Sequence, residues 1–299
     1  MSLREKIEVA KEEREGDVIL KDVKIVNVFD NSIEEGDIII YENKIVGVGK
    51  YNKAKEIYNL KGYYASPGLI DSHIHIESTF LTPGEFAKAV IPQGTLCVIA
   101  DPHEIANVSG IRGIKYILNA SENLPMDIFF MLPSCVPSSP YENSGARLNI
   151  EHLYPFLSNG RVLGLGEMMN YPGVLNCDVD VLKKLEYFEN KIIDGHAPFL
   201  LGNNLNAYIT GGIKSDHECT NLPEAREKLK KGMWIMIREG SAAKDLDALF
   251  PLIDTNTYPQ ILLCTDDRHP KDLIKEGHIN SILKKLVKKG LDPVLSIRL

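Results

Sequence analysis

The pattern of hydrophobic positions changes close to residue 67. Before it, short runs rich in β-branched residues, such as Val23–Val28 and Asp37–Tyr41, alternate with polar turns. Glu42 and Asn43 separate two of these runs, which is typical of a hairpin turn. Residues 17–66 are therefore predicted to form the N-terminal part of a small antiparallel β-domain. The polar residues 1–16 have helical spacing and predict a leader helix before it.

From Pro67 onward, short apolar runs end in polar residues and helical stretches follow. The predicted strands are Gly68–His75, Thr95–Ala100, Asp127–Leu132, Val162–Glu167, Ile192–His196, Ile213–His217, Trp234–Arg238 and Gln260–Thr265. The predicted helices are roughly 83–92, 108–122, 149–158, 178–190, 200–210, 222–231, 244–254 and 271–289. This alternation predicts a parallel sheet with helical crossovers, and eight units are the number that closes a barrel. We expect an α/β fold, a (β/α)8 TIM-like barrel over 67–299, with a doubly wound open sheet as the alternative.

Histidines and carboxylates collect where the predicted strands end, which is where such barrels carry their active sites. The candidate metal ligands are His73, His75, Glu167, His196, His217 and Asp266. His73 and His75 are two positions apart on a strand, so both side chains point to the same face. Imidazole and carboxylate together are ordinary ligands for Zn, Mn or Fe. Taken singly, each residue would also suit a polar strand end, a structural histidine or a helix cap.

Composition narrows the class of protein. The chain has 299 residues, of which 44% are hydrophobic and 25% charged, which excludes disordered, collagen-like and coiled-coil chains. No apolar run suits a membrane helix, and residues 1–16 lack the apolar core of a signal peptide. The net charge of −7 argues against a nucleic-acid surface. Five scattered cysteines without CxxC spacing indicate reduced thiols, so we expect a cytoplasmic protein without nucleic-acid or membrane partners.

The constellation as a whole resembles the metal site of the amidohydrolase superfamily, in strand order and in the flanking segment Ser66–His75. Within the superfamily it is most similar to the bacterial and archaeal adenine deaminases. The similar segments are His73–Ser78, Ala100–Glu104, Gly164–Asn170, Asp194–Pro198, Ser215–Glu218 and Thr265–Asp267. Glu167 stands where many superfamily members place a carboxylated lysine, as it does in the adenine deaminases.

This resemblance implies hydrolysis of a free purine base, adenine, to hypoxanthine and ammonia at two divalent ions, Mn or Fe, with Zn also possible. It implies that His73, His75 and Asp266 hold one ion, that His196 and His217 hold the other, and that Glu167 bridges them. Asp266 would also relay the proton to the leaving amine. Candidates for protonating the ring are Glu77, His103 and Glu104, and candidates for positioning it are Arg238 and Ser241. Another amidohydrolase reaction on a cyclic amidine or amide, or a non-catalytic fragment, stay as alternatives.

The resemblance also bears on length, because adenine deaminases of this type are about twice as long. Asp292 and Pro293 predict a helix start, and the apolar residues that follow stop at Leu299 without a closing polar turn. We therefore expect a chain that ends inside a helix, without the C-terminal part of the family architecture. Residues 17–66 would then keep an unpaired sheet edge. The expected consequence is poor solubility or a homo-oligomer.

Overall fold

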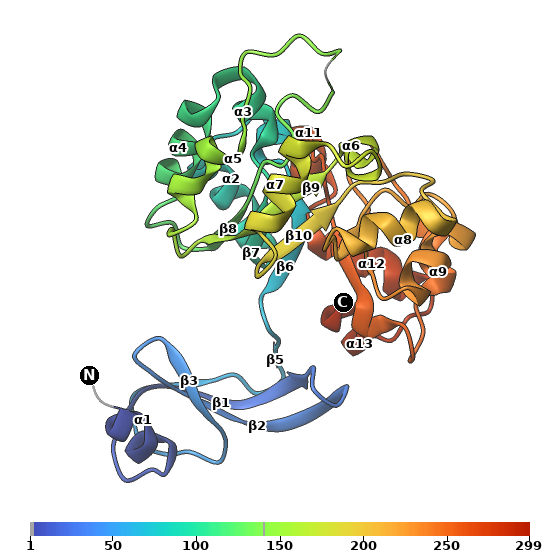
Figure 1. Cartoon of the computed structure of the whole chain (residues 1–299). Helices are drawn as coiled ribbons and strands as arrows, with labels where there is room; N and C mark the ends of the chain where they lie inside the picture. Colours follow the sequence, from blue (N-terminus) through green and yellow to red (C-terminus); the bar gives the residue numbers. More distant parts are fainter. Residues whose placement is uncertain (1–2, 140) are drawn as a thin grey trace. The chain divides into compact units, whose positions relative to one another are not determined.

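The computed structural model describes residues 3–139 and 141–299 (Figure 1). Contacts divide the chain into two compact units: one reaches to Pro67 and includes Gly290–Arg298, and the other covers Gly68–Lys289. Of the helices described, none combines the length and the apolar character needed to span a membrane.

The first unit is built on one sheet. It holds α1 (Leu3–Ala10), β1 (Gly16–Asn27), β2 (Ser32–Tyr41), β3 (Lys44–Gly49), β4 (Ala54–Asn59), β5 (Tyr64–Ala65) and α13 (Pro293–Arg298). The strands β1, β2 and β3 are antiparallel neighbours, as expected. Strands β4 and β5 both pair with β1 in parallel, so the sheet is mixed rather than wholly antiparallel.

The predicted hairpin turn joins β2 to β3. Glu42 and Asn43 have φ angles of +51° and +59°, the two left-handed residues of a type I′ turn. The leader helix is shorter than the range 1–16, of which residues 1 and 2 lie outside the described part. Helix α1 ends at Ala10, Glu12 adopts a left-handed φ of +57°, and Gly16 already belongs to β1.

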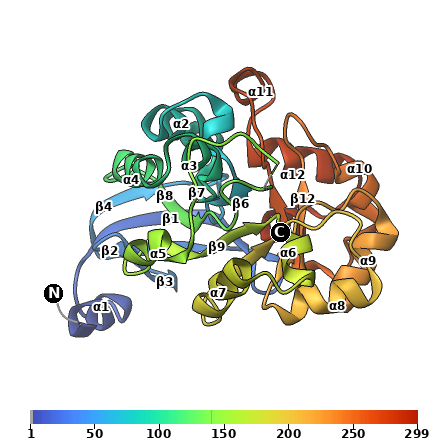
Figure 2. The same ribbon diagram turned by 45° about the horizontal axis from the view of Figure 1, so that its top comes forward.

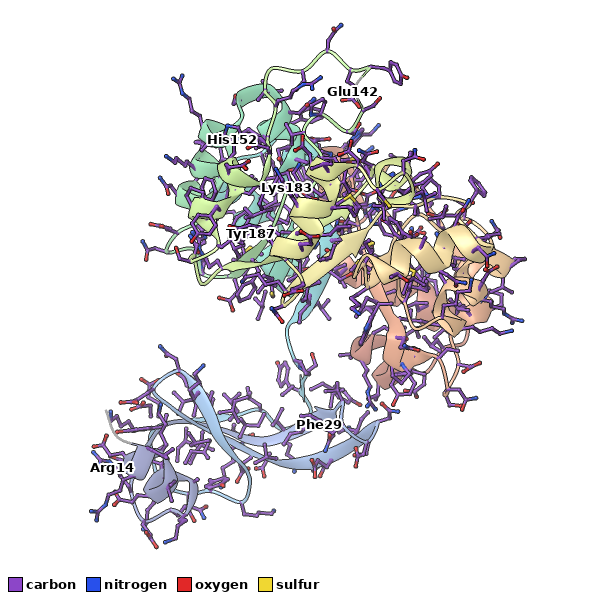
Figure 3. All side chains as sticks on the ribbon, in the orientation of Figure 1. Arg14, Phe29, Glu142, His152, Lys183 and Tyr187 are labelled. Atoms are coloured by element: carbon purple, nitrogen blue, oxygen red, sulfur yellow. The ribbon has the colours of Figure 1, made fainter. Side chains whose placement is uncertain are left out.

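Two small apolar clusters cover the two faces of this sheet. Val9 of α1 packs with Ile19 and Ile39 on one face, whereas Val23 and Ile38 belong to the cluster on the other. The neighbours Ile38 and Ile39 fall on opposite faces because side chains alternate along a strand. Figure 3 labels Phe29 in the turn that follows β1, where its side chain is 89% exposed.

Helix α13 begins as the sequence predicts, with Pro293 in its first turn. The Asp292 carboxylate accepts hydrogen bonds from the backbone N–H groups of Val294 and Leu295, both at 2.9 Å. At the other end of the helix, Arg298 donates to the Phe29 carbonyl at 3.3 Å, within the same unit.

The second unit is the barrel. Its strands are β6 (Leu69–Ile74), β7 (Thr95–Ala100), β8 (Asp127–Leu132), β9 (Val162–Met168), β10 (Ile192–Gly195), β11 (Ser215–Asp216), β12 (Trp234–Arg238) and β13 (Ile261–Cys264). Each overlaps one of the eight predicted strands, and all paired neighbours are parallel.

Hydrogen bonds close the sheet on both sides. The Lys214 N–H donates to the Ile193 carbonyl at 3.0 Å and links the β10 edge to the β11 edge. Strands β6 and β13 are joined by a pair of 3.0 Å bonds, from the His75 N–H to the Asp266 carbonyl and from the Asp266 N–H to the His73 carbonyl. A doubly wound open sheet has two free edges, so these bonds exclude that alternative.

Helices surround the strands of the barrel in both ribbon views (Figures 1 and 2). They are α2 (Pro83–Val90), α3 (His103–Ser109), α4 (Ile111–Ala120), α5 (Ile150–Leu153), α6 (Tyr171–Leu175), α7 (Val179–Tyr187), α8 (Gly202–Thr210), α9 (Leu222–Lys230), α10 (Leu246–Leu249), α11 (Pro270–Lys275) and α12 (Ile279–Lys288). Short 3₁₀ turns lie at Ile76–Thr79, Ile91–Gln93, Tyr154–Phe156, Phe250–Leu252 and Tyr258–Gln260. Phe86, Phe130 and Tyr208 are fully buried between helices and strands and belong to one continuous core.

Four predicted helices are interrupted or end early. Within 244–254, only Leu246–Leu249 is α-helical, and a 3₁₀ turn that contains Pro251 follows it. Gly110, with a φ of +58°, separates α3 from α4 inside the predicted helix 108–122. Gly277, with a φ of +112°, separates α11 from α12 inside 271–289. Pro155 lies at the start of a 3₁₀ turn after α5, so the predicted helix 149–158 is α-helical only at its beginning. Glycine in a left-handed conformation and proline both end the regular backbone pattern. Helix α6 was not predicted from the sequence.

Candidate active site

All six candidate ligands lie at or just beyond the carboxyl ends of barrel strands. His73 lies on β6 and Glu167 on β9, while His75, His196, His217 and Asp266 follow the ends of β6, β10, β11 and β13. Five of the six residues are buried, and His196 is partly exposed. By contrast, His152, which is labelled in Figure 3, lies outside this cluster on α5, and α5 packs against α7. Its Nδ1 accepts a hydrogen bond from the Asn149 N–H at 3.2 Å.

One group of ligands forms where the barrel closes. The Nε2 atoms of His73 and His75 lie 3.2 Å from each other, and the Asp266 Oδ1 lies 3.6 Å and 3.1 Å from them. Asp266 has a left-handed φ of +57°, a conformation that aspartate tolerates better than most residues. The bonds that join β6 to β13 run through the backbone of the same three residues. Barrel closure therefore brings the three side chains together.

Glu167 occupies the middle of the cluster. Its Oε2 lies 2.5 Å from the His196 Nδ1 and 3.0 Å from the His217 Nε2. Its other oxygen, Oε1, lies 3.3 Å from the His75 Nε2. The carboxylate thus faces the first group with one oxygen and the second pair of histidines with the other, as a bridging ligand would.

The electrostatics of the cluster favour ionised carboxylates. Burial alone would raise the pKa of Glu167, but the adjoining imidazoles of His196, His217 and His75 hold that pKa well below its usual range. Burial likewise opposes ionisation of Asp266, and contacts with His73 and His75 nevertheless lower its pKa. The carboxylates in turn raise the pKa of His75 well above its usual value, against the effect of burial.

The donor set fits divalent cations. Three ligand atoms lie within 4.8 Å of one another in the set His73, His75 and Asp266, and again in the set His73, Glu167 and His217. Among the described residues, the buried His217 Nε2 and His73 Nδ1 have no hydrogen-bond partner of acceptable geometry. Buried imidazole and carboxylate atoms that face one another without donors between them are stabilised when a cation binds.

The segment that follows β7 adds two residues to the cluster. The Asp101 Oδ2 accepts a hydrogen bond from the Glu167 N–H at 3.0 Å, and the Asp101 carbonyl lies 2.8 Å from the His75 Nδ1. The His103 Nδ1 lies 3.2 Å from the Glu167 Oε1, which places this candidate proton donor beside the candidate ligands. Sequence reasoning placed Asp101 in a motif but gave it no role. Its position directly after an apolar strand was the available signal.

Glu77 and Glu104, the other two candidates for protonating the purine ring, differ in position. The Glu77 Oε1 accepts from the Ile105 N–H at 3.2 Å, and its other oxygen is buried without a partner in the described structure. Burial raises the pKa of this carboxyl. Glu104 lies at the start of α3, and within the described residues it makes no hydrogen bond or ion pair with the six candidate ligands.

The Arg238 guanidinium contacts three carboxylates. It contacts Glu218, lies 3.0 Å from the Asp245 Oδ2, and lies 3.3 Å from the Asp266 Oδ2. Ser241 is also engaged, since its hydroxyl donates to the Asp272 carboxylate at 2.5 Å and accepts from the His269 N–H at 2.9 Å. The structure therefore places Arg238 beside a candidate ligand, and Ser241 in a contact between the segment after β12 and the start of α11.

Glu218 is an acid that sequence reasoning left without a role. Its Oε1 lies 3.7 Å from the His196 Nδ1 and 3.6 Å from the His217 Nε2, and the three residues form a further possible ligand group. Its place next to His217 in the sequence was the signal that could have identified it.

Asp71 and His278 form a fully buried pair below the first group of ligands. The His278 Nε2 lies 3.0 Å from the Asp71 Oδ2, and its Nδ1 lies 2.9 Å from the Thr95 Oγ1. Asp71 also accepts hydrogen bonds from the N–H groups of Thr265 and His73, at 3.1 Å and 3.3 Å. The pair thus ties the start of α12, β6 and the end of β13 together beneath the candidate ligands.

The sequence profile of the amidohydrolase family matches residues 64–295, which is most of the chain. The chain belongs to the amidohydrolase family. Amidohydrolases are metal-dependent, in agreement with the ligand groups described above. Within the family, the chain is 48% identical over 301 residues to an adenine deaminase of Kosmotoga olearia, and covers 52% of that protein. It is 50% identical over 299 residues to the adenine deaminase of Clostridium acetobutylicum, again covering 52% of it.

Nearly all of this chain is aligned in both comparisons, 100% and 99%, so it spans about half the length of these curated relatives. Two solved structures share its fold at low sequence identity. An atrazine chlorohydrolase from Arthrobacter aurescens, crystallised with zinc, matches with a TM-score of 0.61 at 14% identity, over 89% of this chain and 75% of that one. A triazine hydrolase variant matches with a TM-score of 0.60 at 15% identity, over 90% and 74%. These likenesses support the barrel assignment.

Proposed function

We propose that this amidohydrolase chain carries an adenine deaminase site that hydrolyses adenine to hypoxanthine and ammonia. The observation that carries the proposal is the convergence of His73, His75, Glu167, His196, His217 and Asp266 at one end of the barrel. The choice of adenine as the substrate rests on relatives named adenine deaminase, which are 48–51% identical to nearly the whole chain.

The ligands divide into two sets that share Glu167. We assign His73, His75 and Asp266 to one divalent ion and His196 and His217 to the other, with Mn or Fe as the expected metals and Zn possible. When bound, such ions supply Lewis acidity that makes hydroxide available near neutral pH. A free purine base is the proposed partner, and the sequence-based expectations of a cytoplasmic homo-oligomer without nucleic-acid or membrane partners stay part of this proposal.

Proton transfer falls to residues that touch the cluster. Asp266 is proposed to accept the proton of the nucleophile and to deliver it to the departing amine, because its carboxylate lies among the ligands. Glu77 and His103 are the proposed donors to the purine ring, since each carries a buried polar atom without a good hydrogen bond among the described residues. The position of Glu104 gives it less support for this role.

Arg238 is assigned a different task from the one that the sequence suggested. Its Nε contacts Asp245 and its Nη1 contacts both Glu218 and Asp266, so Arg238 is proposed to orient Glu218 and Asp266 rather than to hold the purine. The hydroxyl of Ser241 is already paired with Asp272, which leaves its proposed contact with the purine without structural support.

The test is turnover by the purified 299-residue chain loaded with Mn²⁺ or Fe²⁺, followed by chromatography of adenine and hypoxanthine and by ammonia release. Glu167→Ala and Asp266→Ala are expected to abolish turnover, because each removes a ligand. Glu85→Gln is the matched control, since Glu85 is an exposed carboxylate on α2. A folded wild-type chain that binds two ions but leaves adenine intact would sink the proposal. Turnover of another cyclic amidine or amide by that chain would favour the alternative amidohydrolase reaction.

A further inference from the structure

A buried ion cluster lies beneath the loops that carry His196 and His217. It consists of Lys228 and Glu224 on α9 and of Asp216, which directly precedes His217. The exposed fractions of these three residues are 0%, 1% and 0%. None of them belongs to the six candidate metal ligands.

The contacts of the cluster end on the backbone of the two ligand loops. The Lys228 Nζ donates to the Ala197 carbonyl at 2.7 Å and to the Glu224 carboxylate at 2.8 Å, and it lies 3.1 Å from the Asp216 Oδ1. The Asp216 carboxylate accepts from the N–H groups of Ala197 and Glu218, at 2.9 Å and 2.8 Å. The carbonyl of Ala197, the residue after His196, is therefore hydrogen-bonded to Lys228 and its N–H group to Asp216. Asp216 also binds the N–H group of Glu218, the residue after His217.

A gain in the stability of the fold does not by itself explain why three charged side chains are buried here. Removing three charges from water is costly, and well-packed apolar residues of similar size often stabilise a fold as well as a buried ion pair does. What apolar side chains cannot do is hold two N–H groups and a carbonyl of different loops in one arrangement. The geometry therefore points to a role in orienting the backbone next to the two histidines.

We propose that Lys228 is a positioning residue for the half of the metal centre formed by His196 and His217. The inference rests on the proposed two-metal site. Lys228 contacts Asp216, Glu224 and the Ala197 carbonyl at once, and so fixes the Asp216 carboxylate where it accepts the two N–H groups of the ligand loops. The other half of the centre, at His73, His75 and Asp266, has no contact with Lys228 among the described residues.

The same helix supplies a matched control. Lys231 lies 2.9 Å from the Glu227 carboxylate four residues before it, and it donates to the Gly202 carbonyl at 2.9 Å. Lys228 has the same two kinds of partner, a glutamate at i−4 and a backbone carbonyl from the segment after β10. Lys231 and Glu227 are partly exposed, and their backbone partner is Gly202, the first residue of α8, rather than the residue next to His196.

The experiment measures Mn²⁺ binding by the full chain, by calorimetric titration and by metal content after dialysis. Wild type is expected to bind two ions. Lys228→Met is expected to weaken one of the two sites roughly 10–100-fold, the usual effect of removing an outer partner of a metal ligand. Lys231→Met is expected to bind both ions as wild type does. In a His196→Ala background, Lys228→Met should leave the remaining ion unaffected, because the two changes act on the same site.

A double variant, Lys228→Met with Glu224→Gln, removes one positive and one negative charge, so the net charge of the buried cluster is unchanged. It is therefore less prone to misfold than Lys228→Met alone. If it folds by circular dichroism and binds two ions with wild-type affinity, the positioning role is refuted while the metal centre stands. If both Lys228 variants unfold and Lys231→Met does not, the cluster serves folding itself and the proposal fails. Wild type without bound metal would overturn the two-metal site as well, whereas two bound ions without adenine turnover would overturn only the proposed reaction.

Discussion

Gly166, one position before the central Glu167, leaves no room for a side chain. A Cβ atom built at this position would lie 2.6 Å from the Asp101 Cγ and closer still to the Asp101 Oδ2. Real Cβ atoms do not approach other atoms to within 3.0 Å, so Gly166→Ala must displace a fully buried carboxylate. That carboxylate accepts the 3.0 Å hydrogen bond from the Glu167 N–H, and the displacement breaks it.

The size of the effect follows from two contributions. Forcing an extra methyl group into a packed interior costs about 1–3 kcal/mol. Leaving a buried donor and a buried carboxylate without their shared hydrogen bond costs about 1–3 kcal/mol more. Gly166→Ala is therefore expected to lower the free energy of unfolding by about 2–6 kcal/mol, a large share of the roughly 5–15 kcal/mol that stabilises an ordinary domain.

Urea unfolding followed by circular dichroism measures this difference. Gly160→Ala is the control, because a Cβ at Gly160 meets no atom within 4 Å, and we expect its free energy of unfolding to stay within about 0.5 kcal/mol of wild type. If Gly166→Ala were as stable as Gly160→Ala, Asp101 would be free to move, and its proposed support of Glu167 would be wrong.

Three further outcomes are expected. His278→Leu removes the buried hydrogen-bond partner of Asp71 and should lower the free energy of unfolding by about 1–3 kcal/mol; an unchanged thermal midpoint would contradict this. Mn²⁺ should raise the midpoint of thermal unfolding and a chelator should reverse the rise, because an ion at 100 times its dissociation constant adds about 2.7 kcal/mol to the free energy of unfolding. A midpoint that responds to neither would argue against a metal centre. Partial burial raises the pKa of Cys97 to about 11, so roughly 0.1% of this thiol is ionised at pH 8. Because the thiolate is the reactive form, an alkylating reagent should label the exposed Cys177 before Cys97. Equal labelling rates of the two cysteines by mass spectrometry would refute the burial argument.

The sequence identified the repeating elements because their signals are local. All eight barrel strands fall where apolar runs end in polar residues, and the turn at Glu42 and Asn43 follows from residue types that tolerate a positive φ. The helix breaks at Gly110 and Gly277 were missed. A glycine inside a helical pattern breaks it when the surrounding packing demands a left-handed backbone, and that demand is not visible in a single sequence.

The candidate site divides in the same way. The six ligands were predicted from their types and from their place after strands, and their roles came from a family resemblance. Arg238 and Ser241 looked like free polar groups on a loop, but the fold pairs them with Asp245 and Asp272. Asp245 meets Arg238 because the segment after β12 folds back onto the end of that strand, and Asp272 meets Ser241 because β12 and β13 become neighbours. Residue type alone indicates neither contact.

Taken by itself, the sequence determined the order of the barrel strands and the family, and it proposed a set of candidate ligand residues, because each depends on local pattern or on short motifs. Tertiary structure decided which polar groups meet. Closure between β6 and β13 joins Asp266 to two histidines nearly two hundred positions earlier, and α9 brings Lys228 beneath loops that lie before it in the chain. These contacts arise because a closed parallel sheet brings all its carboxyl ends to one rim, whatever their separation along the chain.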